Sequence, residues 1–226
     1  MAAATATTIS SAAALAAALL MILCACAAAD DNKLINNAND DDDLVSRACT
    51  NATRYFCHLQ LTKDACVSTL RSPDIPQAAT VKDLSDLTLR AFDLVGISAA
   101  VADAAAADAA AANGGDAGAA RSLQYCRVDY DQMARTVPEC RRLVTRYKAG
   151  GGRLGESTYD EMPLFGCVDR LRDAAVACWD QVRPSEYLKK AVGKLVREVL
   201  QRANVAKAIQ EVMLGMVERD PWELNE

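Results

Sequence analysis

The chain has 226 residues, a formal net charge of -5 at pH 7 and an apolar fraction of 51%, with only 5% aromatic residues. This length suffices for one domain with a core, and the acidic balance argues against nucleic acid or an anionic membrane surface as a partner. Because alanine inflates the apolar fraction, we expect a core of small and aliphatic side chains packed closely between helices.

Residues 12–29 form an uncharged apolar run that ends in small residues, and an acidic stretch follows directly. This pattern predicts a signal peptide over residues 1–29 and therefore a secreted, extracellular protein with no membrane attachment after cleavage. Since no Lys or Arg precedes the run, two other interpretations stay open. One is a retained membrane anchor, because about 18 apolar residues can just span a bilayer. The other is a bacterial lipoprotein site at Cys26.

Residues 30–43 are polar and acidic without periodicity, so we expect a disordered leader that cannot bury enough surface to offset the entropy of ordering. Order is expected from Leu44, where two short helical pieces fit before a turn that contains two prolines. The sequon Asn51-Ala52-Thr53 makes Asn51 a candidate for N-glycosylation in an exported protein.

An amphipathic helix is predicted from about residue 80 onward. Thr80-x-x-Asp83 has near capping-box spacing, and the apolar residues from Val81 to Ile97 form a broad face. Alanine has the highest helix propensity, so the alanine-rich tract at 99–112 is expected to continue this helix. A flexible low-complexity arm is the alternative for the tract.

Three further helices are predicted, over residues 117–148, 158–183 and 185–213. Pro138 should kink the first of them, because proline lacks the amide proton and crowds the preceding turn. The glycines at 150–152 lack the following lysine of a phosphate loop and are expected to end it. The predicted fold class is all-α: a domain over residues 44–217 in which an N-terminal helical hairpin precedes an up-and-down four-helix bundle, followed by a polar tail at 218–226.

Seven of the nine cysteines lie beyond the predicted leader, and an exported protein is expected to pair them as disulfides. Cys57 and Cys66 are close enough to staple the short N-terminal hairpin. Cys49 is then the candidate for a free thiol, although it could displace Cys57 as the partner of Cys66.

The other four cysteines fall on two predicted long helices, with Cys126 and Cys140 on one face of the first and Cys167 and Cys178 on one face of the second. In antiparallel helices the nested bonds Cys126–Cys178 and Cys140–Cys167 have nearly constant sums of residue numbers, 304 and 307, whereas crossed bonds give 293 and 318. Crossing would put one pair out of register by about 37 Å, against the roughly 4.4 to 6.8 Å that a disulfide allows between Cα atoms. We expect the nested set, and a single Cys126–Cys167 bond is the alternative.

Catalytic chemistry finds little support in the sequence. His58 is the only histidine and has no second ligand at helical spacing, and no Cys-x-x-Cys pair suggests a zinc site. Asp129 and Asp131 point to different faces of a helix and are expected to be solvated. Trp179 is expected to pack against the bundle, while Trp222 lies in the polar tail. The sequence therefore predicts no catalytic residue, no cofactor and no metal.

Three short segments share their order and spacing with a family of exported helical proteins. They are Cys57-(x8)-Cys66 followed by VSTL, SLQYC at 122–126 followed by Tyr130, and ANVAKAI at 203–209. Together with the leader, they resemble the plant invertase and pectin methylesterase inhibitor family over about residues 44–213. The resemblance implies a four-helix bundle with an N-terminal hairpin that inhibits a cell-wall carbohydrate-active enzyme in the apoplast by binding it.

The resemblance also indicates a target. The Pro-Lys-Phe tripeptide of some invertase inhibitors is missing, which favours pectin methylesterase, with acid invertase as the alternative. The exposed side of the second and third bundle helices is the implied docking region, without named contact residues. Family members normally need four cysteines, so Cys49, Cys140 and one of Cys167 or Cys178 are additions. A helical carrier of a hydrophobic ligand is the rival hypothesis from another class.

Overall fold

The computed structural model of the chain describes residues 40–55, 61–74, 81–112, 116–155 and 157–216. Within these ranges every regular element is a helix and no strand occurs, which confirms the all-α class for this part of the chain. The predicted signal peptide, the polar tail, His58 and Trp222 lie outside the described residues.

Two short helices come first, α2 (Asp40–Tyr55) and α3 (Lys63–Leu70), and they pack against each other. Because α2 begins at Asp40, the expectation of disorder up to residue 43 is wrong for residues 40–43.

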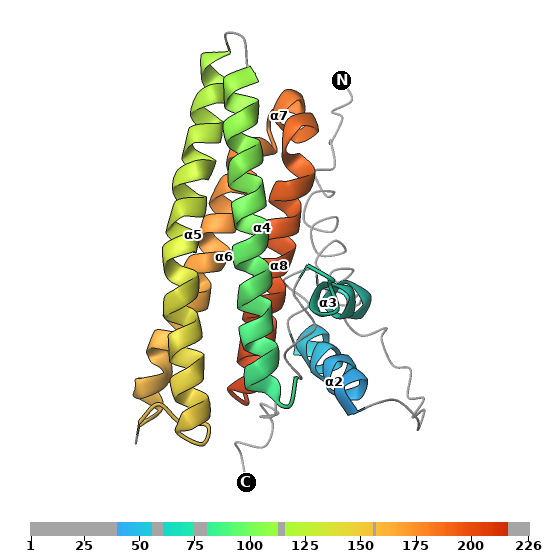
Figure 1. Cartoon of the computed structure of the whole chain (residues 1–226), viewed down its shortest axis with the longest axis vertical. Coiled ribbons are helices and arrows are strands. Elements are labelled where there is room, and N and C mark those ends of the chain that lie inside the picture. Colours follow the sequence, from blue (N-terminus) through green and yellow to red (C-terminus); the bar gives the residue numbers. More distant parts are fainter. Residues whose placement is uncertain (1–39, 56–60, 75–80, 113–115, 156, 217–226) are drawn as a thin grey trace, which may run out of the picture. The chain divides into compact units, whose positions relative to one another are not determined.

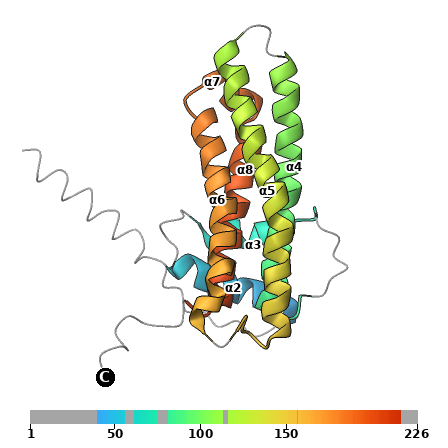
Figure 2. The ribbon, with the colours of Figure 1, turned by 90° about the vertical axis from the view of Figure 1, so that its left-hand side faces the viewer.

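Among the described residues, four long helices form a helical bundle: α4 (Leu84–Ala112), α5 (Ala117–Ala149), α6 (Met162–Val182) and α8 (Gly193–Met213). Each packs against two others, α4 against α5 and α8, and α6 against α5 and α8. Figures 1 and 2 show the four helices side by side, and α2 and α3 lie against α8 near one end.

The alanine-rich tract continues α4 as a helix, as predicted. Ala99, Ala102 and Ala106 are buried at three- and four-residue steps, so the neighbouring helices can approach α4 closely. In the described part of the chain, α4 is the one helix long and apolar enough to cross a bilayer by length and composition. Its Asp93 and Asp103, however, form ion pairs with arginines of α5, as expected for a helix within the bundle.

α5 closely matches the predicted helix 117–148 and is helical through Pro138. The glycines end it as expected, because Gly151 and Gly152 have φ values of 67° and 90°. This left-handed region is strained for residues that carry a Cβ atom, so glycine suits both positions. The chain reverses here and leads towards α6.

Two helix starts differ from the predicted ones. The side chain of Asp83 accepts a hydrogen bond of 2.9 Å from the amide of Asp86, so α4 is capped by Asp83 and begins four residues after Thr80. A 3-10 turn, η2 (Thr158–Glu161), precedes α6. Its capping box is formed by Ser157 with Asp160.

The last predicted helix is divided in two. Ser185 caps a short helix α7 (Glu186–Ala191), and α8 starts only at Gly193. Val192 between them has φ of -132° and ψ of -8°, outside the helical region. A β-branched residue next to a glycine has low helix propensity, which accounts for a break at this point.

The core lies between the four long helices. Its largest fully buried side chains are aliphatic with few aromatics, as the composition predicts, and include Phe92, Leu123, Tyr130, Met133, Leu164, Leu171 and Ile209. Ile97 is an exception to the predicted apolar face of α4, because 37% of it is exposed.

Candidate functional site

Two disulfides join α5 to α6. Cys126–Cys178 and Cys140–Cys167 have Cα–Cα distances of 4.5 and 5.6 Å, so both nested bonds form and the alternative Cys126–Cys167 bond does not. The hydroxyl of Tyr130 lies 3.2 Å from the Sγ atom of Cys178 in the interior. The α5–α6 pair is therefore fixed at two levels along its length.

The third disulfide corrects the predicted hairpin pairing. Cys66 bonds to Cys49, with a Cα–Cα distance of 5.7 Å, so the predicted Cys57–Cys66 bond is wrong and Cys49 is not a free thiol. Both bonded cysteines are fully buried where α2 packs against α3. Cys57 lies outside the described residues. The three bonds use the other six of the seven cysteines that follow the predicted signal peptide.

The solvent side of α5 carries two large apolar residues, Tyr125 and Val128, which are 54% and 59% exposed. They are three residues apart and therefore neighbours on the helix surface. Glu139, fourteen residues after Tyr125, faces α6 and pairs with Arg170 at 3.0 Å. Fourteen residues make about four turns of a helix, so Tyr125 and Glu139 lie on nearly the same face. Tyr125 is therefore on the side of α5 that borders α6.

The two aspartates of α5 differ in their environment. Asp131 is exposed and pairs with Arg135 at 2.5 Å. Burial raises the pKa of Asp129 to about 6, so the expectation of two solvated carboxylates is wrong for this residue. A carboxyl group with such a pKa is suited to proton transfer, but Asp129 does not line either of the two hollows described next.

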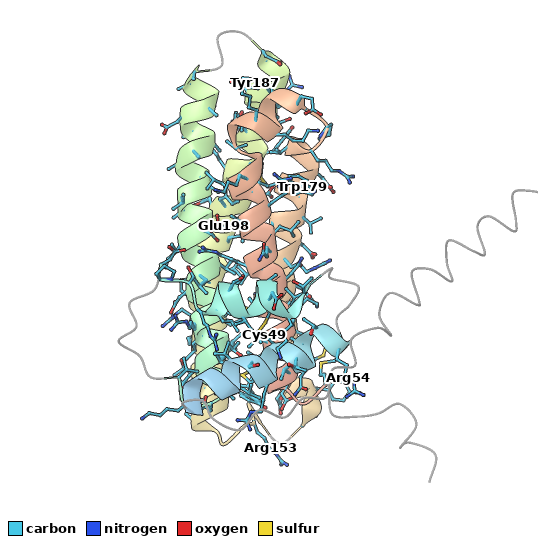
Figure 3. The ribbon with its side chains drawn as sticks, turned by 90° about the vertical axis from the view of Figure 1, so that its right-hand side faces the viewer. Cys49, Arg54, Arg153, Trp179, Tyr187 and Glu198 are labelled. Carbon is cyan, nitrogen blue, oxygen red and sulfur yellow. A yellow bond between two sulfur atoms is a disulfide. The ribbon has the colours of Figure 1, made fainter. Side chains whose placement is uncertain are left out.

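Two adjoining hollows lie on the α3–α4–α8 side of the bundle, around Glu198, which Figure 3 shows on α8 beside α3. The smaller has a volume of about 190 Å³ and the larger about 460 Å³. The smaller is lined by Asp74, Ile97, Ser98, Val101, Leu195, Glu198 and Arg202. The larger is lined by Ser68, Thr69, Ser72, Lys194, Arg197, Glu198, Gln201 and Arg202.

Arg202 is the charged group shared by both hollows, and it is only 7% exposed. Its guanidinium pairs with Asp74 at 2.5 Å and with Glu198, and it donates to the carbonyl of Leu94 at 3.3 Å. Arg202 is not among the site residues predicted from the sequence. A signal was present, because Arg202 follows Val199 by three residues and so places a charge on an apolar face of the predicted last helix.

Two other predicted residues can be placed. Asn51 is exposed on α2, so the sequon is accessible on the folded surface. Trp179 is half-buried on α6, and the guanidinium of Arg197 lies 5.5 Å from its ring centroid. In the part of the chain that the structure describes, no group of three or more His, Cys, Asp or Glu residues is placed to hold a metal ion.

No protein-family model matches the chain, and no curated protein matches it at a significant level.

Proposed function

We propose that this protein is a secreted inhibitor that binds and blocks a cell-wall carbohydrate-active enzyme, with pectin methylesterase as the first target and acid invertase as the second. In this proposal α4, α5, α6 and α8 form an up-and-down four-helix bundle, and α2 and α3 are its N-terminal hairpin. The observation that supports it best is the α5–α6 pair, which is held by two disulfides and exposes Tyr125 and Val128.

Rigidity makes this pair suitable for docking. Association costs free energy because side chains and backbone lose freedom, and a surface that is already ordered loses less. Two cross-links hold α5 and α6 in one register before any partner arrives. Tyrosine is enriched among the residues that dominate binding energy in protein interfaces, so Tyr125 is the proposed anchor.

The chemistry of the hollows favours binding over catalysis. Hydrogen bonds from Arg202 and Ser72 hold the pKa of Asp74 below its ordinary value. A general acid or base works best with a pKa near the working pH, so Asp74 is poorly suited to proton transfer. Glu198 is likewise engaged in an ion pair with Arg202.

The rival hypothesis, a carrier of a hydrophobic ligand, has less support. Pockets for small molecules usually enclose about 300 to 1,000 Å³ and are mainly apolar. The smaller hollow, at about 190 Å³, is below that range, and the larger one is lined by charged, hydroxyl and amide groups. Neither offers a lipid-sized apolar cavity.

The test is a titration of the purified, oxidised protein against a panel of pectin methylesterases and acid invertases, with residual enzyme activity as the readout. We expect inhibition of at least one enzyme. The double variant Tyr125→Ala/Val128→Asp should raise the inhibition constant at least tenfold, because hot-spot residues each contribute about 2 kcal/mol or more.

Val101→Asp is the matched control. Val101 is exposed to a similar degree, 51%, but lies on α4, away from the proposed docking face. It should leave inhibition unchanged. If no enzyme in either class is inhibited or bound, the proposed function is wrong, and if Val101→Asp weakens inhibition as much as the α5 variant, the docking face is wrong.

A further inference from the structure

The larger hollow carries an inference that does not depend on the inhibitor proposal. It lies where α3 meets α8, and its lining holds three cations, Lys194, Arg197 and Arg202, against one anion, Glu198. Asp74 adjoins it and pairs with Arg202. The buried guanidinium is therefore compensated by two carboxylates, and the excess positive charge resides on the two exposed cations.

Lys194 and Arg197 are available to a ligand. Neither forms an ion pair with any of the described residues, and both are exposed on α8. They are three residues apart and hence neighbours on the helix surface. Arg197 is also held over the ring of Trp179, at 5.5 Å from the centroid, which limits its freedom before binding. Two adjacent cations, one of them positioned, fit a ligand that carries negative charge.

The neutral groups of the lining specify the rest of the ligand. The hydroxyl of Ser68 donates to the carbonyl of Ala65 at 3.1 Å, and that of Ser72 donates to Asp74 at 2.8 Å. In these bonds both hydroxyls use their protons, and Ser72 Oγ also accepts from the amide of Asp74 at 3.4 Å, so each oxygen keeps a lone pair that can accept a hydrogen bond from a ligand. A ligand with donors of its own matches this arrangement. Sugar hydroxyls do so, whereas phosphate and sulfate groups at neutral pH are chiefly acceptors.

The size of the hollow agrees with this chemistry. Its volume of about 460 Å³ falls in the range of small-molecule sites, about 300 to 1,000 Å³. Gln201 adds a side-chain amide to the lining, which can both donate and accept hydrogen bonds. Its NH₂ group donates to the hydroxyl of Thr69 at 3.3 Å, and this bond ties the α8 wall to the α3 wall.

We propose that the hollow between α3 and α8 binds an acidic carbohydrate, a uronic-acid oligosaccharide. The carboxylates of the sugar would pair with Lys194 and Arg197, and its hydroxyls would donate to the oxygens of Ser68 and Ser72. Such a site would hold the protein on an acidic polysaccharide, and none of its lining residues belongs to α5, the helix that carries Tyr125.

Isothermal titration calorimetry of the oxidised protein with a linear oligomer of galacturonic acid tests the proposal, at pH 7 and low salt and with no enzyme present. Binding is expected, and it should weaken at least about tenfold when the oligomer is methyl-esterified, because the charge is lost while the hydroxyls remain. The double variant Lys194→Ala/Arg197→Ala should weaken binding of the acidic oligomer by at least the same factor.

The matched control is Lys190→Ala/Arg146→Ala, which removes the same two charges from exposed positions outside the hollow. It should bind as the unaltered protein does, and thermal unfolding should show that all variants are folded. The proposal is overturned if the acidic oligomer does not bind, if both double variants weaken binding equally, or if inorganic phosphate displaces the oligomer at equal concentration. Because no target enzyme takes part, failure here leaves the inhibition titration unaffected.

Discussion

The α2–α3 pair, which is the predicted N-terminal hairpin, and the α5–α6 pair are both helix pairs joined by disulfides, yet only the second was paired correctly from the sequence. In α5 and α6 each helix carries two cysteines, so a single antiparallel register has to satisfy two bonds at once. The hairpin has one bond and two candidate partners for Cys66. Cysteine spacing predicts pairing when several bonds share one register, and it does not when one bond stands alone.

The largest effect is expected from removing one disulfide of the α5–α6 pair, whose pairing was predicted correctly. Cys126→Ala/Cys178→Ala opens a loop with a sequence separation of 52 residues, and the chain-entropy model assigns such a loop about 4 kcal/mol of unfolding free energy. Urea denaturation of the oxidised protein measures the loss. A change below about 1 kcal/mol would mean that packing and the Cys140–Cys167 bond alone fix the α5–α6 pair.

Much of the fold follows from local signals in the sequence. The long helices were placed by apolar residues at three- and four-residue steps, and glycine correctly marked the end of α5 at residues 150–152. Signals spread over a long helix are redundant, so one misplaced residue does not remove them. The starts of α4 and α6 were less accurate. A single residue, Asp83, caps α4, and a 3-10 turn capped by Ser157 takes the place of the first predicted turn of α6.

The candidate sites were harder to predict, because their residues come together only in the folded chain. Ser72 of the turn after α3 and Arg197 of α8 line one hollow although 125 positions separate them. The raised pKa of Asp129 was missed for a related reason, since spacing along one helix does not show how deeply a residue is buried in the folded chain. Residue spacing within a helix predicts which residues share a face. The contacts between helices decide whether those residues are buried, exposed or part of a hollow.

The second prediction tests the corrected hairpin bond. Cys57→Ala should leave the unfolding free energy unchanged, because Cys49–Cys66 remains. Adding Cys49→Ala removes that bond and also denies Cys66 an alternative partner in the hairpin. The chain-entropy model gives about 3 kcal/mol for this separation of 17 residues, less than for the α5–α6 bond.

Urea denaturation compares the two variants, and non-reducing peptide mapping of the Cys57→Ala protein should recover Cys49 joined to Cys66. If Cys57→Ala alone causes the full loss and the second substitution adds nothing, Cys57 is the true partner. The hairpin would then have the pairing first expected from the sequence.

The smallest expected effect concerns Asp129 on α5 and depends on pH. Burial raises its pKa from 3.8 to about 6 in the folded protein, so the folded state disfavours the carboxylate. Between about pH 4 and 6 the folded state binds a proton that the unfolded state has released, and this group's contribution to stability falls as pH rises through that window. Above pH 6 both states are ionised and the cost is fully present.

Asp129→Asn should therefore raise the midpoint of thermal unfolding at pH 7.5, relative to the unaltered protein, and this gain should disappear at pH 3.5, where the native carboxyl is protonated. Asp131→Asn on the same helix is the control, because Asp131 is exposed and takes part in a surface ion pair. Such pairs contribute about 0.5 kcal/mol or less, so the control should lose a little stability at neutral pH. A gain for Asp129→Asn that persists at pH 3.5 would point to better amide packing and away from desolvation of the charge. In that case, burial of the Asp129 carboxylate on α5 would not be what makes the stability of the protein depend on pH.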